Sequence, residues 1–500
     1  MEQKCKFYIK AENFFNKGKY ENAIRCCQKS LEVNPDNHMA YCILGLIAKQ
    51  KGIIGDAFAY FKKSLEIKPE YIDGINNLGA IYNDNNMKEE AQDCFKKAIE
   101  LYPNYPEANY NLANVLASNG NIQQSVGYYK KAIELRPDYY DSLVNIANIL
   151  FEQGNLNEAE NYYKRATDCK CDKSKDVAVL NYGYVLLYKW GVSRWREFIS
   201  ANISGFKKDS IYEAEARLCI EVANWVLGDV PVNIDSVKRT YTISNKNPHY
   251  LNNRDIRAYC NMLKNLDAFY KEHQWKDGNA ENILYLVGDS HTLTCSNKVI
   301  NINNAGYKCK TELIRGCKIW HLINDKDNKM KVAYKRIMNS IPSASNIVMS
   351  FGEIDCRTNE GVYYRYLKYG NDLHEETDKL LDAYFLKVIV PLKGMNHNIY
   401  IWGIPAPHEE LVISELHHSR REEYVAFINY FNEKLRISAN EAEVRYVDNY
   451  SITNNKNGMS NYDTHIDFAH LKPEIYSKAI IKSGCNNATQ SFGIYNNCNL

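Results

Sequence analysis

The spacing of apolar residues changes along the chain. Up to about residue 173, apolar positions recur with a helical period, and the whole pattern returns every 34 residues. The period is marked by four prolines, Pro35, Pro69, Pro103 and Pro137. From Asn282 onward, short apolar runs alternate with longer helical stretches. The pattern therefore predicts an all-helical N-terminal region and a C-terminal region of alternating strands and helices.

Each 34-residue unit carries the same kinds of residue at the same positions. The third unit shows the Leu78-Gly79 pair, then Ala91, Phe95 and Pro103. These residues resemble the tetratricopeptide motif, and the resemblance covers residues 4–173, or about five repeats. It implies two antiparallel helices per repeat, with small residues where the helices approach closely. Stacked repeats then form a superhelix with a concave groove.

Asn77, Asn111 and Asn145 recur with the same period. They resemble the asparagines that line the inner groove of the repeats in protein O-GlcNAc transferases and hydrogen-bond an extended peptide there. The resemblance implies a protein or peptide partner in this groove, since an amide offers both a donor and an acceptor to a backbone. The alternative is that these residues simply occupy a polar helix face in an Asn-rich chain.

The remaining chain divides into three parts by pattern. Residues 174–280 contain helical stretches that we interpret as an extension of the repeats, followed by a polar linker from Trp275. Residues 281–485 form the α/β domain, and residues 486–500 form a tail. The candidate strands of the α/β domain are Ile283–Val287, Thr311–Arg315, Ile347–Phe351, Asn398–Ile404 and Val444–Val447. Its candidate helices are Thr292–Asn303, Met330–Ile341, Leu373–Leu392, Arg421–Asn440 and one beginning near Pro473.

Alternating strands and helices predict a parallel sheet with functional loops at the carboxyl ends of its strands. Asp289, Ser290 and His291 follow the first candidate strand, and Asp467 and His470 follow the fifth. A nucleophilic serine needs a general base, and the base needs an orienting carboxylate. We therefore expect these loops to bring Ser290, His470 and Asp467 together. The alternative for the first loop is a polar turn capped by Ser290.

The two motifs together resemble GDSL/SGNH hydrolases, which carry Gly-Asp-Ser in their first block and Asp-x-x-His in their last. The resemblance covers residues 283–485 and implies a flavodoxin-like α/β/α sandwich. It also implies that a glycine N–H of the second block points at the oxyanion. Gly316 is the candidate for this role, and Gly306 is the fallback.

The third block departs from the family pattern. Gly352 and Asp355 align with Gly-x-Asn-Asp, but Ile354 stands where the family has an asparagine that donates to the oxyanion. Losing one such donor costs about 2.7–4 kcal/mol of transition-state stabilisation. Glu353 and Asp355 also bring negative charge to this place. We expect Arg357 either to offset them or to replace the missing donor, unless the acidic pair binds sugar hydroxyls or a cationic substrate.

Composition narrows the possible functions. The net charge of +2 excludes a general electrostatic attraction to nucleic acid. The chain has no run of 18 apolar residues, so no membrane span is expected. Its fifteen cysteines lack the paired spacing of zinc sites, so we expect reduced thiols, a cytoplasmic location, and neither a metal nor a cofactor.

These observations predict an enzyme that acts on acyl esters, with a glycan or glycoconjugate as substrate and His291 in the pocket wall. Three alternatives remain open. The α/β domain could be a decayed hydrolase that serves as a scaffold, or it could be a sugar O-acyltransferase. Asp289-x-His291 also opens the metallophosphoesterase pattern, although the later Gly-Asn-His and Gly-His-x-His motifs of that family are absent.

Overall fold

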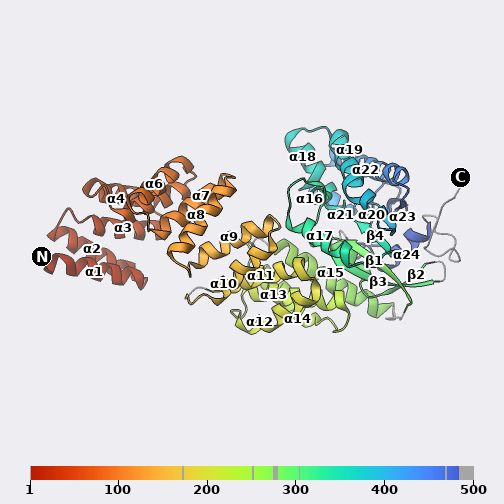
Figure 1. The fold of residues 1–500 in the computed structure, drawn as a ribbon, viewed down its shortest axis with the longest axis horizontal. Coiled ribbons are helices and arrows are strands. Elements are labelled where there is room, and N and C mark those ends of the chain that lie inside the picture. The colour runs from red at the N-terminus through yellow and green to blue at the C-terminus, as the bar shows by residue number, and fades with distance from the viewer. Residues whose placement is uncertain are drawn as a thin grey trace. The chain divides into compact units, whose positions relative to one another are not determined.

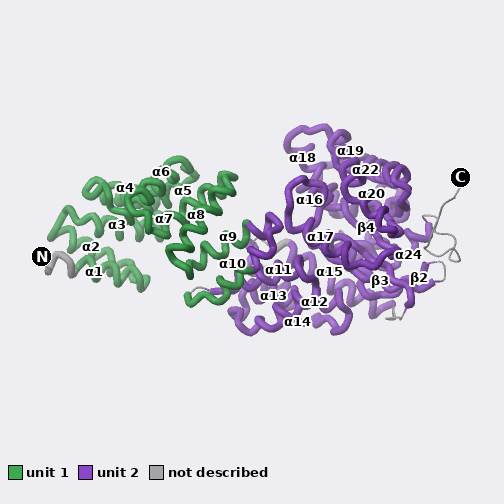
Figure 2. The backbone as a smooth tube through the Cα atoms, viewed as in Figure 1, with its two compact units in different colours: residues 1–149, 161–173 green, residues 150–160, 174–500 purple. Residues whose placement is uncertain are grey.

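A computed structural model describes residues 2–171, 174–250, 253–273, 280–302, 305–467 and 470–482. The chain forms two compact units, which Figures 1 and 2 show. Residues 1–149 and 161–173 form the first unit, and residues 150–160 and 174–500 form the second. The predicted tail, most of the predicted linker, and Phe468 and Ala469 of the last motif lie outside the described residues.

Ten helices form five antiparallel hairpins up to residue 168, which confirms the predicted repeats. Their bounds are α1 Glu2–Asn16, α2 Tyr20–Val33, α3 His38–Gln50, α4 Ile54–Ile67, α5 Ile72–Asp84, α6 Lys88–Leu101, α7 Pro106–Ser118, α8 Ile122–Leu135, α9 Tyr140–Glu152 and α10 Leu156–Asp168. The first helices of four successive hairpins begin at residues 38, 72, 106 and 140, and this spacing is the 34-residue period of the sequence.

The small residues of the repeat motif let two helices approach across an aromatic ring. A Cβ atom built on Gly79 would lie 2.8 Å from Cε1 of Phe95, which is too close for a side chain. The next repeat has Ala113 at the equivalent position and Tyr129 in place of the phenylalanine. Tyr129 is buried, and its hydroxyl donates a 2.5 Å hydrogen bond to the side-chain oxygen of Asn114.

Five further helices precede the sheet. They are α11 Asp176–Trp190, α12 Val192–Asn202, α13 Ile211–Leu227, α14 Ile234–Asn245 and α15 Asn253–Glu272. A Cβ atom on Gly183 of α11 would lie 2.6 Å from Cδ1 of Ile199 in α12. The two residues are 16 positions apart, as are Gly79 and Phe95. This first hairpin of the extension therefore keeps the close helix contact of the repeats.

A six-stranded sheet with the order β2-β3-β1-β4-β5-β6 forms the centre of the α/β domain (Figure 1). The strands are β1 Asn282–Gly288, β2 Val299–Ile302, β3 Ala305–Leu313, β4 Asn346–Ser350, β5 Asn398–Trp402 and β6 Arg445–Val447. Every neighbouring pair is parallel except β2 and β3, which are antiparallel. In β4 and β5 the last four residues are all buried, so helices cover both faces of the sheet.

Helices connect and flank these strands. Their bounds are α16 Ile319–Ile323, α17 Lys329–Ser340, α18 Gly361–Tyr369, α19 Leu373–Tyr384, α20 Val390–Lys393, α21 Glu409–Glu415, α22 Arg421–Glu441, α23 Tyr450–Thr453 and α24 Pro473–Lys482. One face of the sheet packs on α24, where Trp402 stacks on Tyr476 with ring centroids 4.3 Å apart. No described helix is both long enough and apolar enough to cross a membrane.

The predicted helix Thr292–Asn303 is wrong. Residues Ser290–Cys295 form a short 3-10 helix, and Val299–Ile302 form the edge strand β2. The hydroxyl of Thr292 donates to the carbonyl of Asp289 at 2.7 Å, and the β-branched residues of β2 favour an extended chain. Ser290 therefore stands at the start of a 3-10 helix of six residues, which has a weaker dipole than the longer predicted α-helix.

The contact between Gly79 and Phe95 predicts opposite effects for two glycine substitutions in the repeats. Gly79→Ala should destabilise the protein by roughly 1–3 kcal/mol because the new methyl group overpacks the ring. Gly127→Ala is the matched control, since no heavy atom lies within 4 Å of its Cβ position in α8. It should stabilise by up to about 1 kcal/mol. Urea denaturation followed by far-UV circular dichroism tests both, and equal effects would contradict the packing account.

Candidate active site

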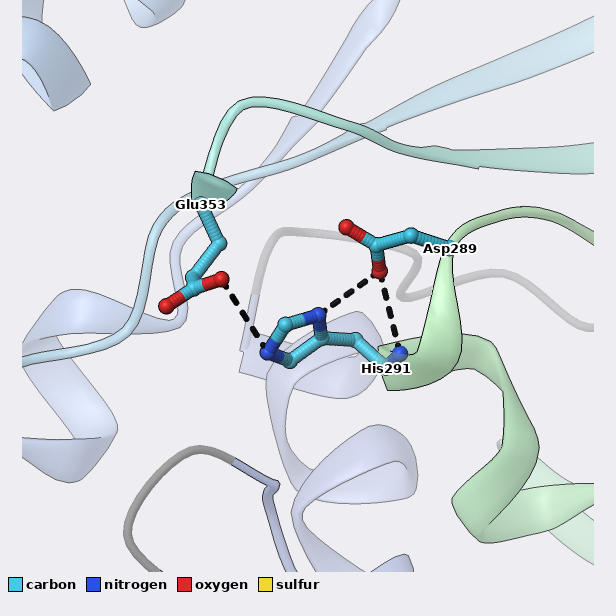
Figure 3. Close-up of side chains that lie close together, drawn as sticks. All are labelled: Asp289, His291 and Glu353. Atoms are coloured by element: carbon cyan, nitrogen blue, oxygen red, sulfur yellow. Dashed lines mark hydrogen bonds and ion pairs between the residues drawn. The ribbon is translucent and has the colours of Figure 1, made fainter. Parts of the chain in front are cut away.

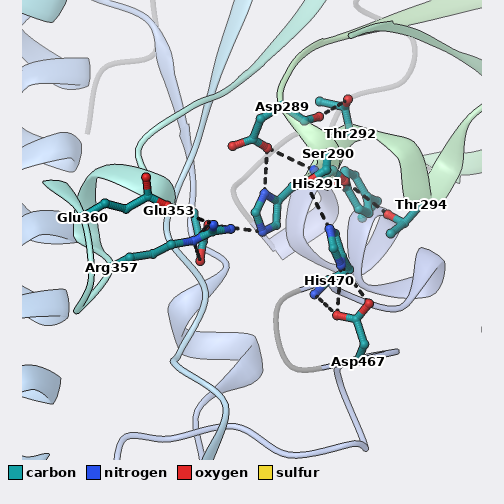
Figure 4. Close-up of polar contacts among 11 residues, drawn as sticks. Asp289, Ser290, His291, Thr292, Thr294, Glu353, Arg357, Glu360, Asp467 and His470 are labelled. Atoms are coloured by element: carbon teal, nitrogen blue, oxygen red, sulfur yellow. Dashed lines mark hydrogen bonds and ion pairs between the residues drawn. The ribbon is translucent and has the colours of Figure 1, made fainter. Parts of the chain in front are cut away.

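Three side chains predicted from the sequence meet at the carboxyl edge of the sheet (Figure 4). The hydroxyl oxygen of Ser290 lies 3.2 Å from Nε2 of His470. Nδ1 of the same imidazole lies 2.8 Å and 2.9 Å from the two carboxylate oxygens of Asp467. Because Nδ1 faces a carboxylate, it carries the proton, and Nε2 is left to accept from the serine hydroxyl.

Local structure fixes both ends of this arrangement. β1 ends at Gly288, where a Cβ atom would lie 2.3 Å from the backbone oxygen of Ser350, so only glycine allows this approach. The carboxylate of Asp289 accepts the backbone N–H of His291 at 3.0 Å and thereby closes the turn around Ser290. On the other loop, the backbone N–H of His470 donates to Asp467 at 2.8 Å.

A second Asp–His pair, drawn in Figure 3, lies beside the first, as Figure 4 shows. Nδ1 of His291 lies 2.7 Å from the carboxylate of Asp289, and Nε2 lies 3.5 Å from the carboxylate of Glu353. Its ring centroid is 4.9 Å from that of His470. Asp289 and His291 are both buried, whereas Ser290 between them is half-buried. The side chain of Ser290 therefore lies in a more exposed environment than those of Asp289 and His291, so the serine contacts one Asp–His pair while its two neighbours form the other.

The second pair continues into a row of alternating charges across the loops. Arg357 contacts Glu353 at 2.9 Å and Glu360 at 3.3 Å, and Lys318 contacts Glu360 at 2.8 Å. The row therefore runs from the loop after β3 through the loop after β4 to the turn after β1. Opposite charges that are partly withdrawn from water attract more strongly than surface pairs, so the row ties the three loops together.

The carboxylates on both sides keep His291 protonated. Burial alone lowers the pKa of this imidazole, but Asp289 and Glu353 outweigh that effect and raise the pKa to about 9. The pKa of Asp289 stays below its ordinary value even though burial raises it, because His291 attracts the carboxylate. At neutral pH the group is therefore a buried imidazolium between two carboxylates.

Asp289, His291 and Glu353 are the described residues whose types and spacing could hold a metal ion. Each nitrogen of His291 already faces a carboxylate, and Arg357 donates to both oxygens of Glu353. A cavity of about 10 Å³ adjoins Asp289 and His291, which is room for one water molecule. These three side chains therefore suit a protonated His291 between two carboxylates better than a divalent cation with water ligands.

The remaining predicted pocket residues have different roles. Asp355 was expected beside Glu353, but its carboxylate accepts the backbone N–H of Ile319 at 2.8 Å and caps α16. Burial raises the pKa of Asp355 to about 7, so it is only partly ionised at neutral pH. Arg357 directs its N–H groups at Glu353 and Glu360, which supports the expectation that it offsets negative charge.

The two predicted glycines lie in turns. Gly316 has a φ of +67° in the turn from Ile314 to Cys317, where the N–H of Cys317 donates to the carbonyl of Ile314 at 3.1 Å. Its role as an oxyanion donor stays a prediction. Gly352 has a φ of +113°, and a Cβ atom there would lie 3.1 Å from Cδ1 of Ile404, so this glycine serves close packing after β4.

The asparagine ladder of the repeats joins neighbouring hairpins. The side-chain nitrogen of Asn111 donates to the side-chain oxygen of Asn76 at 2.9 Å, and that of Asn145 donates to Asn114 at 3.0 Å. The nitrogen of Asn77 contacts the sulfur of Cys42 at 3.6 Å. The three ladder residues are half-buried. Their amide nitrogens thus serve the solenoid itself, and binding of a peptide stays a prediction.

The sequence interpretation missed the pairing of His291. Asp289 and His291 were assigned to the pocket, but their mutual bond and the link to Glu353 were not predicted. The spacing Asp-x-His was the available signal, since an aspartate side chain often bonds to the backbone two residues on and so lies close to that residue. Lys318 and Glu360 carried no comparable signal, because charged residues in loops are common on any surface.

Comparisons with known proteins support the N-terminal assignment. Tetratricopeptide repeat models match residues 10–72, 72–105 and 105–172. Residues 10–172 therefore carry tetratricopeptide repeats. These matches do not extend into the α/β domain, and no curated protein sequence matches the chain.

Solved structures resemble parts of the chain. PilF of Pseudomonas aeruginosa is 18% identical, with a TM-score of 0.38 over 43% of this chain and 96% of its own. MamA is 26% identical, with a TM-score of 0.28 over 32% of this chain and 94% of its own. YrrB, described as a repeat protein with an unusual peptide-binding site, is 22% identical over 38% and 97%, with a TM-score of 0.31. Since all three TM-scores lie below 0.5, we draw no conclusion on function from them.

The buried imidazolium predicts a stability change in mildly alkaline solution. The pKa of His291 in the folded chain, about 9, lies above its ordinary value of 6.5, so its contribution is full below pH 6.5. That contribution, at most roughly 3 kcal/mol, is lost as pH rises through about 9. Urea midpoints measured between these pH values should fall more steeply for the wild type than for His291→Gln, because the buried thiols, whose pKa values are raised by burial, lower the stability of both proteins near pH 9. The exposed His418→Gln variant is the control, and an unchanged fall in His291→Gln would refute the assignment.

Proposed function

We propose that the α/β domain is a serine hydrolase of the GDSL/SGNH type that acts on acyl esters. The contact of Ser290 with His470, itself bonded to Asp467, carries this proposal. The order of the five parallel strands supports it, because numbering them 1 to 5 along the chain gives 2-1-3-4-5, the order of flavodoxin-like sheets. The two motifs stand at the carboxyl ends of strands, where such sheets hold their sites.

The geometry suits a two-step acyl transfer. Ser290 Oγ attacks the acyl carbon while Nε2 of His470 takes its proton, and Asp467 stabilises the imidazolium that forms. The tetrahedral intermediate then expels the alcohol, which receives the proton from His470. In the second step, water, or a sugar hydroxyl in an acyltransferase, loses its proton to His470 and attacks the acyl carbon. The bond from that carbon to Ser290 Oγ then breaks, and His470 returns the proton to Oγ. A glycan or glycoconjugate ester remains our proposed substrate class.

The oxyanion needs donors other than the missing asparagine. The backbone N–H of Ser290 is one proposed donor and that of Gly316 is the other. Ile354 is buried and offers no hydrogen bond, so the site has one donor fewer than its presumed relatives. The net neutral row of charges around Arg357 limits the repulsion that Glu353 would otherwise exert on a developing anion.

The absent amide also favours the second candidate, a scaffold with a decayed hydrolase domain. That candidate predicts a folded domain without a reactive serine. A metallophosphoesterase is disfavoured, because both nitrogens of His291 already face carboxylates. Elemental analysis of the purified protein tests this rival, and a stoichiometric metal would support it.

The repeats support a role in protein–protein interaction, and we propose that their concave groove holds an extended peptide. Asn111 and Asn145 each donate a side-chain N–H inside the solenoid. The amide oxygen of each residue is an acceptor that a backbone N–H of a bound peptide would meet. The peptide would be read mainly through its backbone, so the groove would accept varied sequences.

A serine-directed fluorophosphonate probe tests the proposed enzyme. Wild-type protein should be labelled at Ser290, because His470 activates the hydroxyl as it would for a substrate. Ser290→Ala should not be labelled. Asp467→Asn should react on the order of 10⁴-fold more slowly, since an amide that donates to Nδ1 of His470 holds the imidazole in the wrong tautomer. Ser414→Ala, an exposed serine of α21, is the control and should react as the wild type does. A folded wild type without labelling would favour the scaffold.

A peptide-library selection on the full chain tests the groove. The wild type should enrich extended peptides, and the triple variant Asn77→Ala, Asn111→Ala, Asn145→Ala should lose that enrichment. The triple variant also loses bonds between hairpins, so its circular dichroism must match the wild type. Asn429→Ala, an exposed position in α22, controls for amide removal outside the repeats. Equal enrichment by the wild type and the triple variant would overturn the proposed role of the ladder.

A further inference from the structure

Side chains of the helical extension bond to backbone carbonyls in the two loops that carry the candidate triad. Three such bonds are Trp225 Nε1 to Leu293 at 2.6 Å, Tyr270 Oη to Thr294 at 2.6 Å, and Asn265 Nδ2 to Ile466 at 3.0 Å. The first acceptors lie just after Ser290, and Ile466 immediately precedes Asp467. The extension therefore contacts both the loop that carries Ser290 and the loop that carries Asp467 and His470.

The turn that carries Ser290 rests on an aromatic pair. The rings of Trp225 and Tyr270 lie 5.6 Å apart, and the amine of Lys298 stands 5.6 Å and 4.8 Å from their centroids. Tyr270 is buried. In return, the side-chain nitrogen of Asn297 donates to the carbonyl of Trp225 at 3.3 Å. The turn after β1 is thus bonded to the extension in both directions.

The loop that carries Asp467 and His470 has less support of its own. The described residues between α23 and α24, which are 454–467 and 470–472, form no helix, and two isolated β-bridges involve them. The N–H of Ile466 donates to the carbonyl of His470 at 2.8 Å, which closes the loop on itself. The bond from Asn265 joins this closed loop to a helix, at the carbonyl of the residue before Asp467.

Helix α15 links the two loops because it supplies both Asn265 and Tyr270. Five residues separate them, which corresponds to about 7.5 Å along the axis of a rigid helix. A helix holds such a spacing far better than a loop does. The 3.2 Å contact between Ser290 and His470 joins residues 180 positions apart, so it depends on how these loops are held.

We propose that Asn265 is a positioning residue that holds the Asp467–His470 loop against the Ser290 turn through α15. The effect on reactivity rests on the proposed hydrolase function, whereas the effect on the Asp467–His470 bond does not. The extension is then part of the catalytic unit rather than a spacer after the repeats. The competing view is that the bond adds about 1 kcal/mol of stability and has no effect on the relay.

Asn265→Asp tests the proposal with little change of size. Its carboxylate cannot donate to the carbonyl of Ile466 and repels it instead. Lys264→Ala, exposed on the same helix, controls for a change in α15. Tyr250→Phe controls for a lost hydrogen bond in the extension, since its hydroxyl donates to Glu215 and not to either loop. Asn265→Ala provides a second variant should the aspartate prevent folding.

Two measurements are made on the full chain. The first is the rate constant for fluorophosphonate labelling of Ser290, corrected for the folded fraction. We expect it to fall on the order of tenfold or more in Asn265→Asp, because small misplacements of catalytic groups cost this much. The second is the low-field proton resonance of His470 Nδ1–H, identified by its loss in His470→Asn. We expect it to shift or broaden in Asn265→Asp and to stay unchanged in both controls.

The two readouts separate failure of the inference from failure of the proposed function. If the wild type is not labelled but the low-field resonance still shifts in Asn265→Asp, the hydrolase proposal is rejected and the positioning role is kept. A wild-type rate and resonance in a less stable Asn265→Asp would overturn the positioning role. A wild type without the resonance would contradict the Asp467–His470 bond, and the inference would fall with it.

Discussion

The contact between Ser290 and His470, at 3.2 Å, is the interaction on which the account of the α/β domain depends. It exists because parallel strands place their carboxyl ends at one edge of the sheet. β1 delivers the serine there, and the chain after β6 returns to the same edge before α24. The serine stands on a short 3-10 helix and the His470 loop contains no described helix, so neighbouring helices help to hold both. The bond from Asn265 to the residue before Asp467 is one such restraint.

Behind the Ser290–His470 contact lies a second group of polar side chains, which begins with Asp289 and His291 on either side of Ser290. Ser290 is half-buried toward the relay, while Asp289 and His291 on either side are buried together. The second pair ends in Glu353 and Arg357, whose charges balance one another. We interpret this row as the support that keeps three loops in place around the proposed active site. The imidazolium of His291 is thus a structural charge beside the imidazole of His470, the proposed general base.

Predictions from the sequence succeeded where a position accepts few residue types for a single physical reason. The small residues facing Phe95 and the acid–base pair ending at His470 follow from packing and from chemistry, and the structure places them accordingly. Strand β2 was missed because its apolar run is only four residues long, and so short a run does not distinguish a strand from the end of a helix. The directions of Glu353 and Asp355 could not be predicted, since a carboxylate two residues away can cap a helix or line a pocket depending on contacts remote in sequence.

Direct observation of an acyl-serine tests the central claim most sharply. The protein would be mixed with p-nitrophenyl acetate, quenched in acid within milliseconds, digested and analysed by mass spectrometry. The account predicts an acetyl group on Ser290 that is absent in His470→Asn. Acetylation confined to lysines in a folded sample, or equal acetylation of Ser290 with and without the imidazole, would contradict it.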